Sequence, residues 1–147
     1  ALLEGETPVL TGRTAIEGVV EAPVVGGNLC LLAATAGTAH QLRVDDRILV
    51  IEEVGEYGYR IDRMLQQLVS AGVFDGVVGV AVGELVDCRE PDGADYTVED
   101  IVMDHLERLD VPVVLDLPVG HGARNVPFVW GRTMRLDGGL MPVVGAV

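Results

Sequence analysis

The chain has 147 residues, of which 49% are hydrophobic and 19 are glycine. This composition predicts one compact domain with its own core and argues against a disordered segment. The formal net charge of −13 argues against nucleic acid as a partner, because phosphate contacts need basic patches. The uncharged stretch 22–39 is close to the length of a membrane span. Its glycines and polar residues instead favour a turn followed by a helix, so we expect no membrane segment.

Short strands are expected first, near 9–10 and 15–21, after an irregular start over 1–7 and around a turn at 11–13. Gly26 and Gly27 are predicted to form a turn or to allow close packing. Asn28 then suits the N-cap of a helix over 28–36. A glycine-rich turn before a helix can bind phosphate. Because neither a P-loop nor a GxGxxG pattern is present, a structural role is favoured here.

The segment 47–72 is predicted to contain a buried strand, an acidic turn and an amphipathic helix. Residues 48–51 are apolar and mostly β-branched, which is typical of a buried strand. A helix is expected over 59–70, because apolar side chains recur at the spacing of one helix face. Gly72 is expected to end this helix. The residues of the apolar face are Ile61, Met64, Leu65 and Leu68. Between strand and helix lies an acidic turn with Glu52, Glu53 and Glu56. Carboxylates at the end of a buried strand are held by rigid backbone, so this turn is the candidate site.

Two further strands are predicted over 77–82 and 111–115, with a helix over 98–109 between them. Thr97 and Asp100 have the spacing of a capping box, and the buried stripe of this helix is expected to be Ile101, Val102, His105 and Leu109. Short extended pieces near 128–130, 133–136 and 140–144 suggest that the domain ends in short antiparallel β-strands. The alternation of strands and helices predicts an α/β fold. Its sheet should be mixed and largely parallel, with flanking helices and short antiparallel β pieces.

His121 lies between two glycines just beyond the third predicted strand, so its ring can be presented into a cleft. With Glu52 it would form the carboxylate and base of a hydrolytic triad. The nucleophile is missing from this pattern. Ser70 is the only serine in the sequence and has no nucleophile-elbow motif around it. Cys30 and Cys88 are both predicted to be small buried side chains, and Cys30 has no basic neighbour to activate it.

A metal site is the rival chemistry, because Glu52, Glu53, Glu56 and His121 could offer oxygen and nitrogen ligands. The sequence has no HExxH motif, and no second histidine lies near either segment. We therefore expect neither a metal nor a cofactor.

Several segments, taken in order, resemble the LD-carboxypeptidase family of serine peptidases: Gly26-Gly-Asn-Leu29, Ile48-Leu-Val-Ile-Glu-Glu-Val-Gly-Glu56, Tyr59-Arg-Ile-Asp-Arg-Met-Leu-Gln-Gln-Leu68, Ala71-Gly-Val-Phe-Asp-Gly-Val77, and Leu117-Pro-Val-Gly-His-Gly122 with Asn125. Members have an N-terminal domain with the serine nucleophile and a C-terminal domain with the glutamate and histidine. The chain resembles the C-terminal, swivelling-type domain alone, which would account for the missing serine and the start at Ala1. The resemblance implies that Glu52 and His121 are the triad residues and that Glu53 is supporting structure.

The resemblance also implies a function. Family members remove the terminal D-alanine of murein tetrapeptides in the cytoplasm during cell-wall recycling, and the pattern around His121 and Asn125 is nearer to this branch. The expected partners are a murein-derived peptide and the N-terminal nucleophile domain of the same protein, with no nucleic acid or membrane; a homodimer stays open. A microcin-type immunity peptidase that cleaves a peptide-nucleotide antibiotic and a non-catalytic binding or swivelling module are the alternatives.

A geometric expectation separates catalysis from a scaffold role. If strands 48–51 and 111–115 are neighbours or one strand apart, Glu52 and His121 should meet at about 2.6–3.2 Å.

Overall fold

Eight strands form one curved sheet in the computed structural model, which describes residues 8–143. The strands are β1 (Leu10–Thr11), β2 (Arg13–Ile16), β3 (Val20–Asn28), β4 (Ile48–Val54), β5 (Gly79–Val86), β6 (Val113–Leu117), β7 (Thr133–Leu136) and β8 (Gly139–Pro142). The helices are α1 (Leu29–Thr35), α2 (Gly58–Ser70) and α3 (Val98–Leu106), the last followed by the 3₁₀ turn η2 (Glu107–Leu109).

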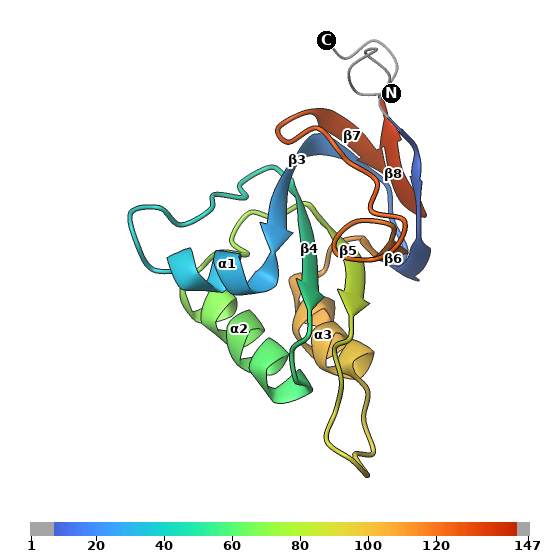
Figure 1. Ribbon diagram of the computed structural model, residues 1–147. Coiled ribbons are helices and arrows are strands. Elements are labelled where there is room, and N and C mark those ends of the chain that lie inside the picture. The colour runs from blue at the N-terminus through green and yellow to red at the C-terminus, as the bar shows by residue number, and fades with distance from the viewer. Residues whose placement is uncertain (1–7, 144–147) are drawn as a thin grey trace.

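The strand order is β1-β8-β7-β3-β4-β5-β6-β2. The central strands β3, β4, β5 and β6 are parallel, and the outer strands pair antiparallel. The mixed α/β sheet expected from the sequence is therefore confirmed. Strands β1 and β2 lie at opposite ends of this order although only Gly12 separates them in sequence. The sheet must curl until its two edges meet, and β7 and β8 arch over one end of it (Figure 1).

Each face of the sheet has its own apolar cluster. On one face the helices pack against alternate strand residues, for example Ile61 and Leu65 of α2 with Leu49 and Ile51 of β4. On the other face the neighbouring residues of the same strands meet the side chains of β1, β7 and β8 inside the curl of the sheet. This division follows from the two-residue period of a strand, which sends successive side chains to opposite faces.

The helix ends confirm the signals in the sequence. The Asn28 side chain accepts a hydrogen bond from the backbone N–H of Leu31, and Gly72 follows α2 with a φ of +68°. Thr97 and Asp100 form a reciprocal capping box at the start of α3.

The predicted stripe of α3 needs correction. The buried residues are Val98, Val102, His105 and Leu106, whereas Ile101 and Leu109 are only partly buried. The α-helix stops at Leu106 and the chain continues as a 3₁₀ turn with a different period, which turns Leu109 away from the stripe.

Of the two roles expected for Gly26 and Gly27, the turn is wrong and the close packing is confirmed at Gly26. Both residues belong to β3 and pair with Val50 and Ile51 of β4. A side chain at Gly26, whose φ is +137°, would overlap the backbone of Val50. Gly26 therefore allows the backbones of β3 and β4 to approach closely, whereas the space beside Gly27 is open. The predicted strand over 15–21 is also wrong, because β2 ends at Ile16 and β3 begins only at Val20.

The other strands occur near their predicted places with shifted ends. Strand β4 continues to Val54, β5 runs from Gly79 to Val86 and β6 from Val113 to Leu117. The piece expected over 128–130 is not a strand, β7 is confirmed, and β8 spans Gly139–Pro142. The predicted irregular start at 1–7 and the end at residue 144 lie outside the described residues.

Cys30 is exposed, contrary to the prediction, because it lies on the outer side of α1. Burial raises the pKa of the Cys88 thiol above its ordinary value. None of the helices within residues 8–143 is both long enough and apolar enough to cross a membrane.

Candidate active site

The carboxyl end of β4 holds two adjacent glutamates whose side chains lie on opposite faces of the sheet. Glu52 follows Ile48 and Val50, which face the interior of the curl, and Glu53 follows Leu49 and Ile51, which face the helices. Both glutamates are buried, with exposed fractions of 6% and 2%. The sequence predicted them in a turn, but both belong to the strand. The period of the strand thus gives the two carboxylates different partners.

Glu53 is bound entirely by the start of α1 and by its own strand. Its Oε1 accepts hydrogen bonds from Asn28 Nδ2 and the Val54 backbone N–H, both at 2.9 Å, and its Oε2 accepts one at 2.8 Å from the Cys30 backbone N–H. A carboxylate near the first backbone N–H groups of a helix is stabilised by the hydrogen bonds and by the helix dipole. These contacts fix the orientation of α1 relative to β4.

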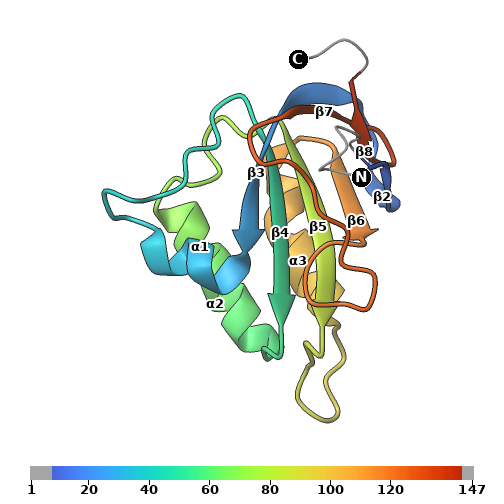
Figure 2. The same ribbon diagram turned by 45° about the horizontal axis from the view of Figure 1, so that its top comes forward.

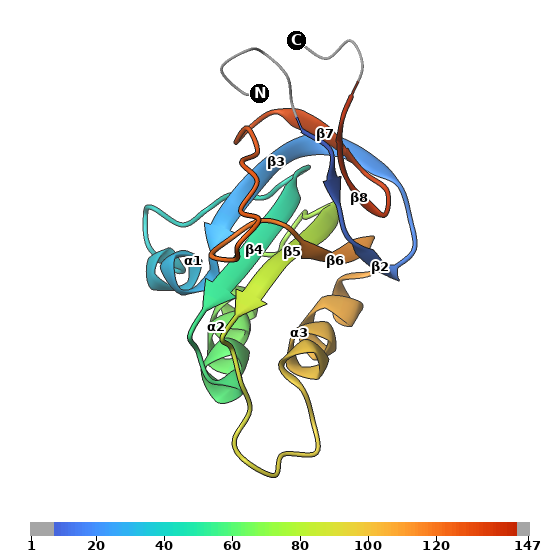
Figure 3. The same ribbon diagram turned by 45° about the vertical axis from the view of Figure 1, so that its right-hand side comes forward.

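Glu52 faces the loop that follows β6, and this loop carries His121. The chain between β6 and β7 passes over β4 and β5 on the face away from α3 (Figures 2 and 3). The two side chains meet there, with His121 Nδ1 2.8 Å from Glu52 Oε2. The distance expected from the sequence is confirmed, and so is its basis, because β4 and β6 are separated only by β5.

The hydrogen bond orders the imidazole from its buried side and leaves its other side open. The His121 side chain is 54% exposed, while that of Glu52 is 8% exposed. A carboxylate that accepts from Nδ1–H favours the neutral tautomer in which Nε2 has a free lone pair. Within residues 8–143 no hydrogen bond engages Nε2. The arrangement can therefore accept a proton at Nε2 and stabilise the resulting imidazolium through Glu52.

Gly120 makes this approach possible. Its φ is +124°, a conformation that side chains strongly disfavour, and an added Cβ would lie 2.7 Å from Glu52 Oε2. The glycine before His121 is thus required by the Glu52 carboxylate itself. The sequence alone indicates only the conformational freedom of a glycine at this position.

The structure separates the other candidate ligands and nucleophiles from this pair. Glu53 is on the far face, and Glu56 forms a 3.1 Å ion pair with Arg60. Within the described part of the chain, no three His, Cys, Asp or Glu side chains are arranged to hold a metal ion. Ser70 ends α2, whose 13 residues begin just beyond β4. At 1.5 Å per residue its position is roughly 18 Å along the helix axis from that end.

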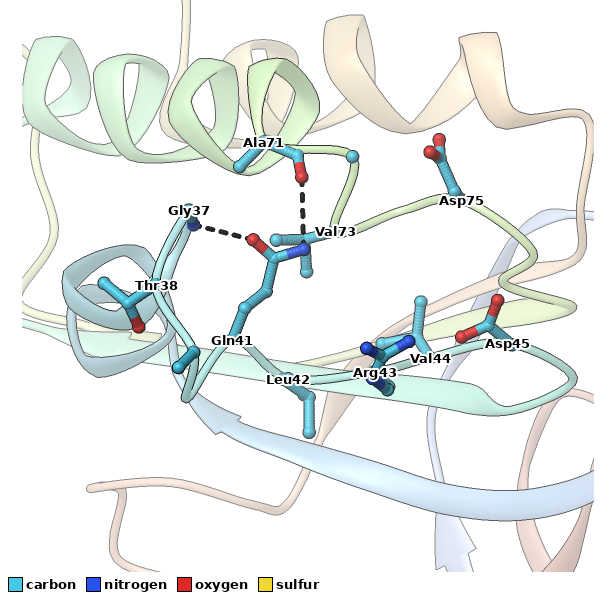
Figure 4. A pocket seen from close by; sticks show the side chains of 12 residues that line it. Gly37, Thr38, Gln41, Leu42, Arg43, Val44, Asp45, Ala71, Val73 and Asp75 are labelled. Carbon is cyan, nitrogen blue, oxygen red and sulfur yellow. Dashed lines mark hydrogen bonds between the residues drawn. The ribbon is translucent and has the colours of Figure 1, made fainter.

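A pocket at the opposite end of β4 is distinct from the candidate site (Figure 4). It is lined by the connection from α1 to β4 and by the segment after α2. Gln41 bridges these two segments, since its side chain accepts from the Gly37 N–H at 2.6 Å and donates to the Ala71 carbonyl at 3.1 Å. The bridge closes the amino end of the sheet, whereas catalytic groups of parallel sheets occur at the carboxyl end.

Comparison with known proteins agrees with the fold. The family model for the LD-carboxypeptidase C-terminal domain matches residues 21–136. The chain therefore belongs to the LD-carboxypeptidase family and corresponds to its C-terminal domain.

Among its relatives is the murein tetrapeptide carboxypeptidase of Pseudomonas aeruginosa, 37% identical over 120 residues that cover 81% of this chain and 39% of that protein. The muramoyltetrapeptide carboxypeptidase of Oxalobacter formigenes has a similar structure, with a TM-score of 0.80 and 28% identity over 90% of this chain and 48% of that one. The microcin C7 self-immunity protein MccF, at 20% identity, shares the fold with a TM-score of 0.77 over 92% of this chain and 42% of its own. The chain thus spans less than half of each of these proteins.

Proposed function

We propose that this chain supplies the glutamate and histidine of a Ser-Glu-His triad in a carboxypeptidase that cleaves an L,D-peptide bond of murein peptides. One observation carries the proposal: the half-exposed imidazole of His121 is bound through Nδ1 to the buried carboxylate of Glu52 at 2.8 Å. A histidine that served only as scaffold would not need a buried carboxylate on one nitrogen and an open side on the other.

The serine nucleophile would come from an N-terminal domain of the same protein. In the proposed reaction, His121 Nε2 takes the proton of the serine hydroxyl as the oxygen attacks the scissile carbonyl. The imidazolium then gives that proton to the amine of the departing D-alanine, and water hydrolyses the acyl-enzyme by the same route. Glu52 holds the ring and stabilises its positive charge throughout. Glu53 has no part in these steps because its oxygens face α1.

The murein substrate is favoured over the antibiotic substrate by the relatives. The Pseudomonas protein that is named for murein tetrapeptide is 37% identical, whereas the similarity to MccF at 20% identity supports the fold alone. We place the reaction in the cytoplasm, in the recycling of cell-wall peptides, as the family resemblance implies. The non-catalytic alternative is disfavoured by the paired geometry of Glu52 and His121.

The test measures D-alanine release from a murein tetrapeptide by the full-length protein that contains this chain. His121→Ala and Glu52→Gln should each lower kcat by on the order of 10³-fold or more, because members of a triad act as a unit. Glu56→Gln is the matched control, since it removes a carboxylate from the same segment and should leave turnover within about twofold of the parent. The 147-residue chain alone should release no D-alanine. Full turnover by the His121→Ala protein would refute the assignment.

A further inference from the structure

An irregularity in β5 brings a third glutamate to the candidate site. The register between β4 and β5 shifts after Ile51, which pairs with Val82, to Glu53, which pairs with Leu85. Two residues of β5, Gly83 and Glu84, therefore stand opposite the single residue Glu52. Such a bulge bends the strand and re-aims its side chains. The sequence did not point to Glu84, because the strand was predicted to end at Val82.

Glu84 contacts the loop of His121 on both sides of the histidine. Its backbone N–H donates a 2.9 Å hydrogen bond to the Val119 carbonyl. Its carboxylate lies directly against Gly122, so that a Cβ added to this glycine would overlap Oε2. One residue of β5 thus holds the loop two positions before His121 and one position after it.

Glu84 as a residue is half-buried, and the burial of its Oε2 atom has no explanation in stability. Glu84 Oε2 is fully buried, and within residues 8–143 no group donates a hydrogen bond to it. A buried polar oxygen without a partner lowers the stability of a fold. Departures from this rule in native proteins occur mainly at functional sites, where another requirement has priority.

The two glycines beside His121 have matching roles. Gly120 makes room for the Glu52 carboxylate, and Gly122 makes room for the Glu84 carboxylate. The backbone before His121 therefore packs against the Glu52 carboxylate, and the backbone after it packs against the Glu84 carboxylate. These close contacts set how near to β4 and β5 the backbone on either side of His121 can lie.

We propose that Glu84 is a positioning residue for His121. By packing its carboxylate under Gly122 and binding Val119, it holds the loop at the height at which Nδ1 reaches Glu52. Its catalytic meaning rests on the function proposed above, but the positioning itself is a property of this chain and can be measured without any reaction.

The test uses ¹⁵N-labelled 147-residue chain and the nitrogen resonances of its histidine rings, recorded with the rings neutral. In the parent, the bond to Glu52 should hold His121 in the single tautomer that is protonated at Nδ1. Glu84→Ala removes the carboxylate under Gly122 but keeps the backbone hydrogen bond to Val119, so the segment after Val119 can shift and His121 should show the tautomer mixture of a free imidazole. Glu84→Gln keeps the shape of the side chain and should keep the single tautomer. The His105 ring, bound to Asp62 at 2.8 Å, is an internal reference that should not change.

Asp92→Ala is the matched control, because it removes an exposed carboxylate from the connection after the same strand. If Glu84 had only a structural role, Glu84→Ala would lower the unfolding midpoint but leave the His121 tautomer fixed, and the proposal would be wrong. If Glu84→Ala does not fold, Glu84→Asp decides, since it keeps the charge but shortens the reach and should also release the tautomer.

Turnover provides an independent second measurement. In the full-length protein, Glu84→Ala should lower kcat by on the order of 10²-fold with KM nearly unchanged, as expected for a misplaced catalytic base. An unchanged kcat in an active parent would contradict the proposal. A parent without D-alanine release would refute the proposed function, while the tautomer measurement would still decide the role of Glu84.

Discussion

Replacing Glu53 by glutamine tests whether Glu53 stabilises the fold, while Glu52 has the proposed catalytic role. The glutamate oxygens accept three hydrogen bonds of 2.8–2.9 Å, and the side chain is only 2% exposed. Glutamine has a single acceptor oxygen, so in either orientation its NH₂ group must face at least one of the backbone N–H donors. The smallest loss is the bond to Cys30. Each bond to a charged group is worth about 1.5–3 kcal/mol, and the others weaken with the loss of charge.

We therefore expect Glu53→Gln to lower the free energy of unfolding by about 2–4 kcal/mol, out of roughly 5–15 kcal/mol for a domain. Urea unfolding followed by circular dichroism measures this, and the midpoint should fall by about 1–2 M. The matched control is Glu56→Gln, whose surface ion pair with Arg60 is worth about 0.2–1 kcal/mol. If Glu53→Gln changes stability by no more than Glu56→Gln does, the assignment of Glu53 as structural support is wrong.

Two further changes test the loop and a helix cap. Gly120→Ala should lower the free energy of unfolding by about 1–3 kcal/mol in urea titration, because φ is +124° and the new Cβ would crowd Glu52 Oε2; a neutral change would show that the loop can move away. The hydrogen bonds from Thr97 lower the pKa of Asp100 below its ordinary 3.8. This contribution is present above that value and lost as the pH falls through the lowered pKa, so the protection factors of the α3 amides, which correct for the intrinsic pH dependence of exchange, should decrease there. In Asp100→Asn that acid-dependent decrease should be absent, and if it persists another group is responsible.

The sequence was sufficient where a local chemical signal determines a local structure. The Asn28 cap, the stripe of α2 and the capping box at Thr97 were all predictable, because each depends on residues a few positions apart. The meeting of Glu52 and His121 followed from the order of parallel strands and is confirmed as a distance, while their catalytic role stays a proposal.

The sequence failed where a distant neighbour decides the conformation. For Gly26 and Gly27 the sequence left a turn and close packing open, because local preference does not show that the β4 backbone lies against Gly26. The extension of β5 through Glu84 is similar. Polar residues at the end of a strand are typical of a loop, whereas here Gly83 pairs with Leu117 of β6 and Glu84 bonds to Val119 in the segment that leads to His121. Tertiary packing overrode propensity at both positions.

The way the sheet closes has a consequence for folding. Strand β1 pairs with β8 and β2 pairs with β6. Residues near 10–16 can therefore pair only after residues near 113–115 and 139–140 have come close to them. These contacts are among the most distant in sequence that the described chain contains, and the entropy of closing such long loops slows their formation. The parallel centre from β3 to β6 can assemble through its helices first. During synthesis, β1 and β2 leave the ribosome before the rest of the sheet but pair last, and until then β6 and β8 each have an unpaired edge to which another chain could bind.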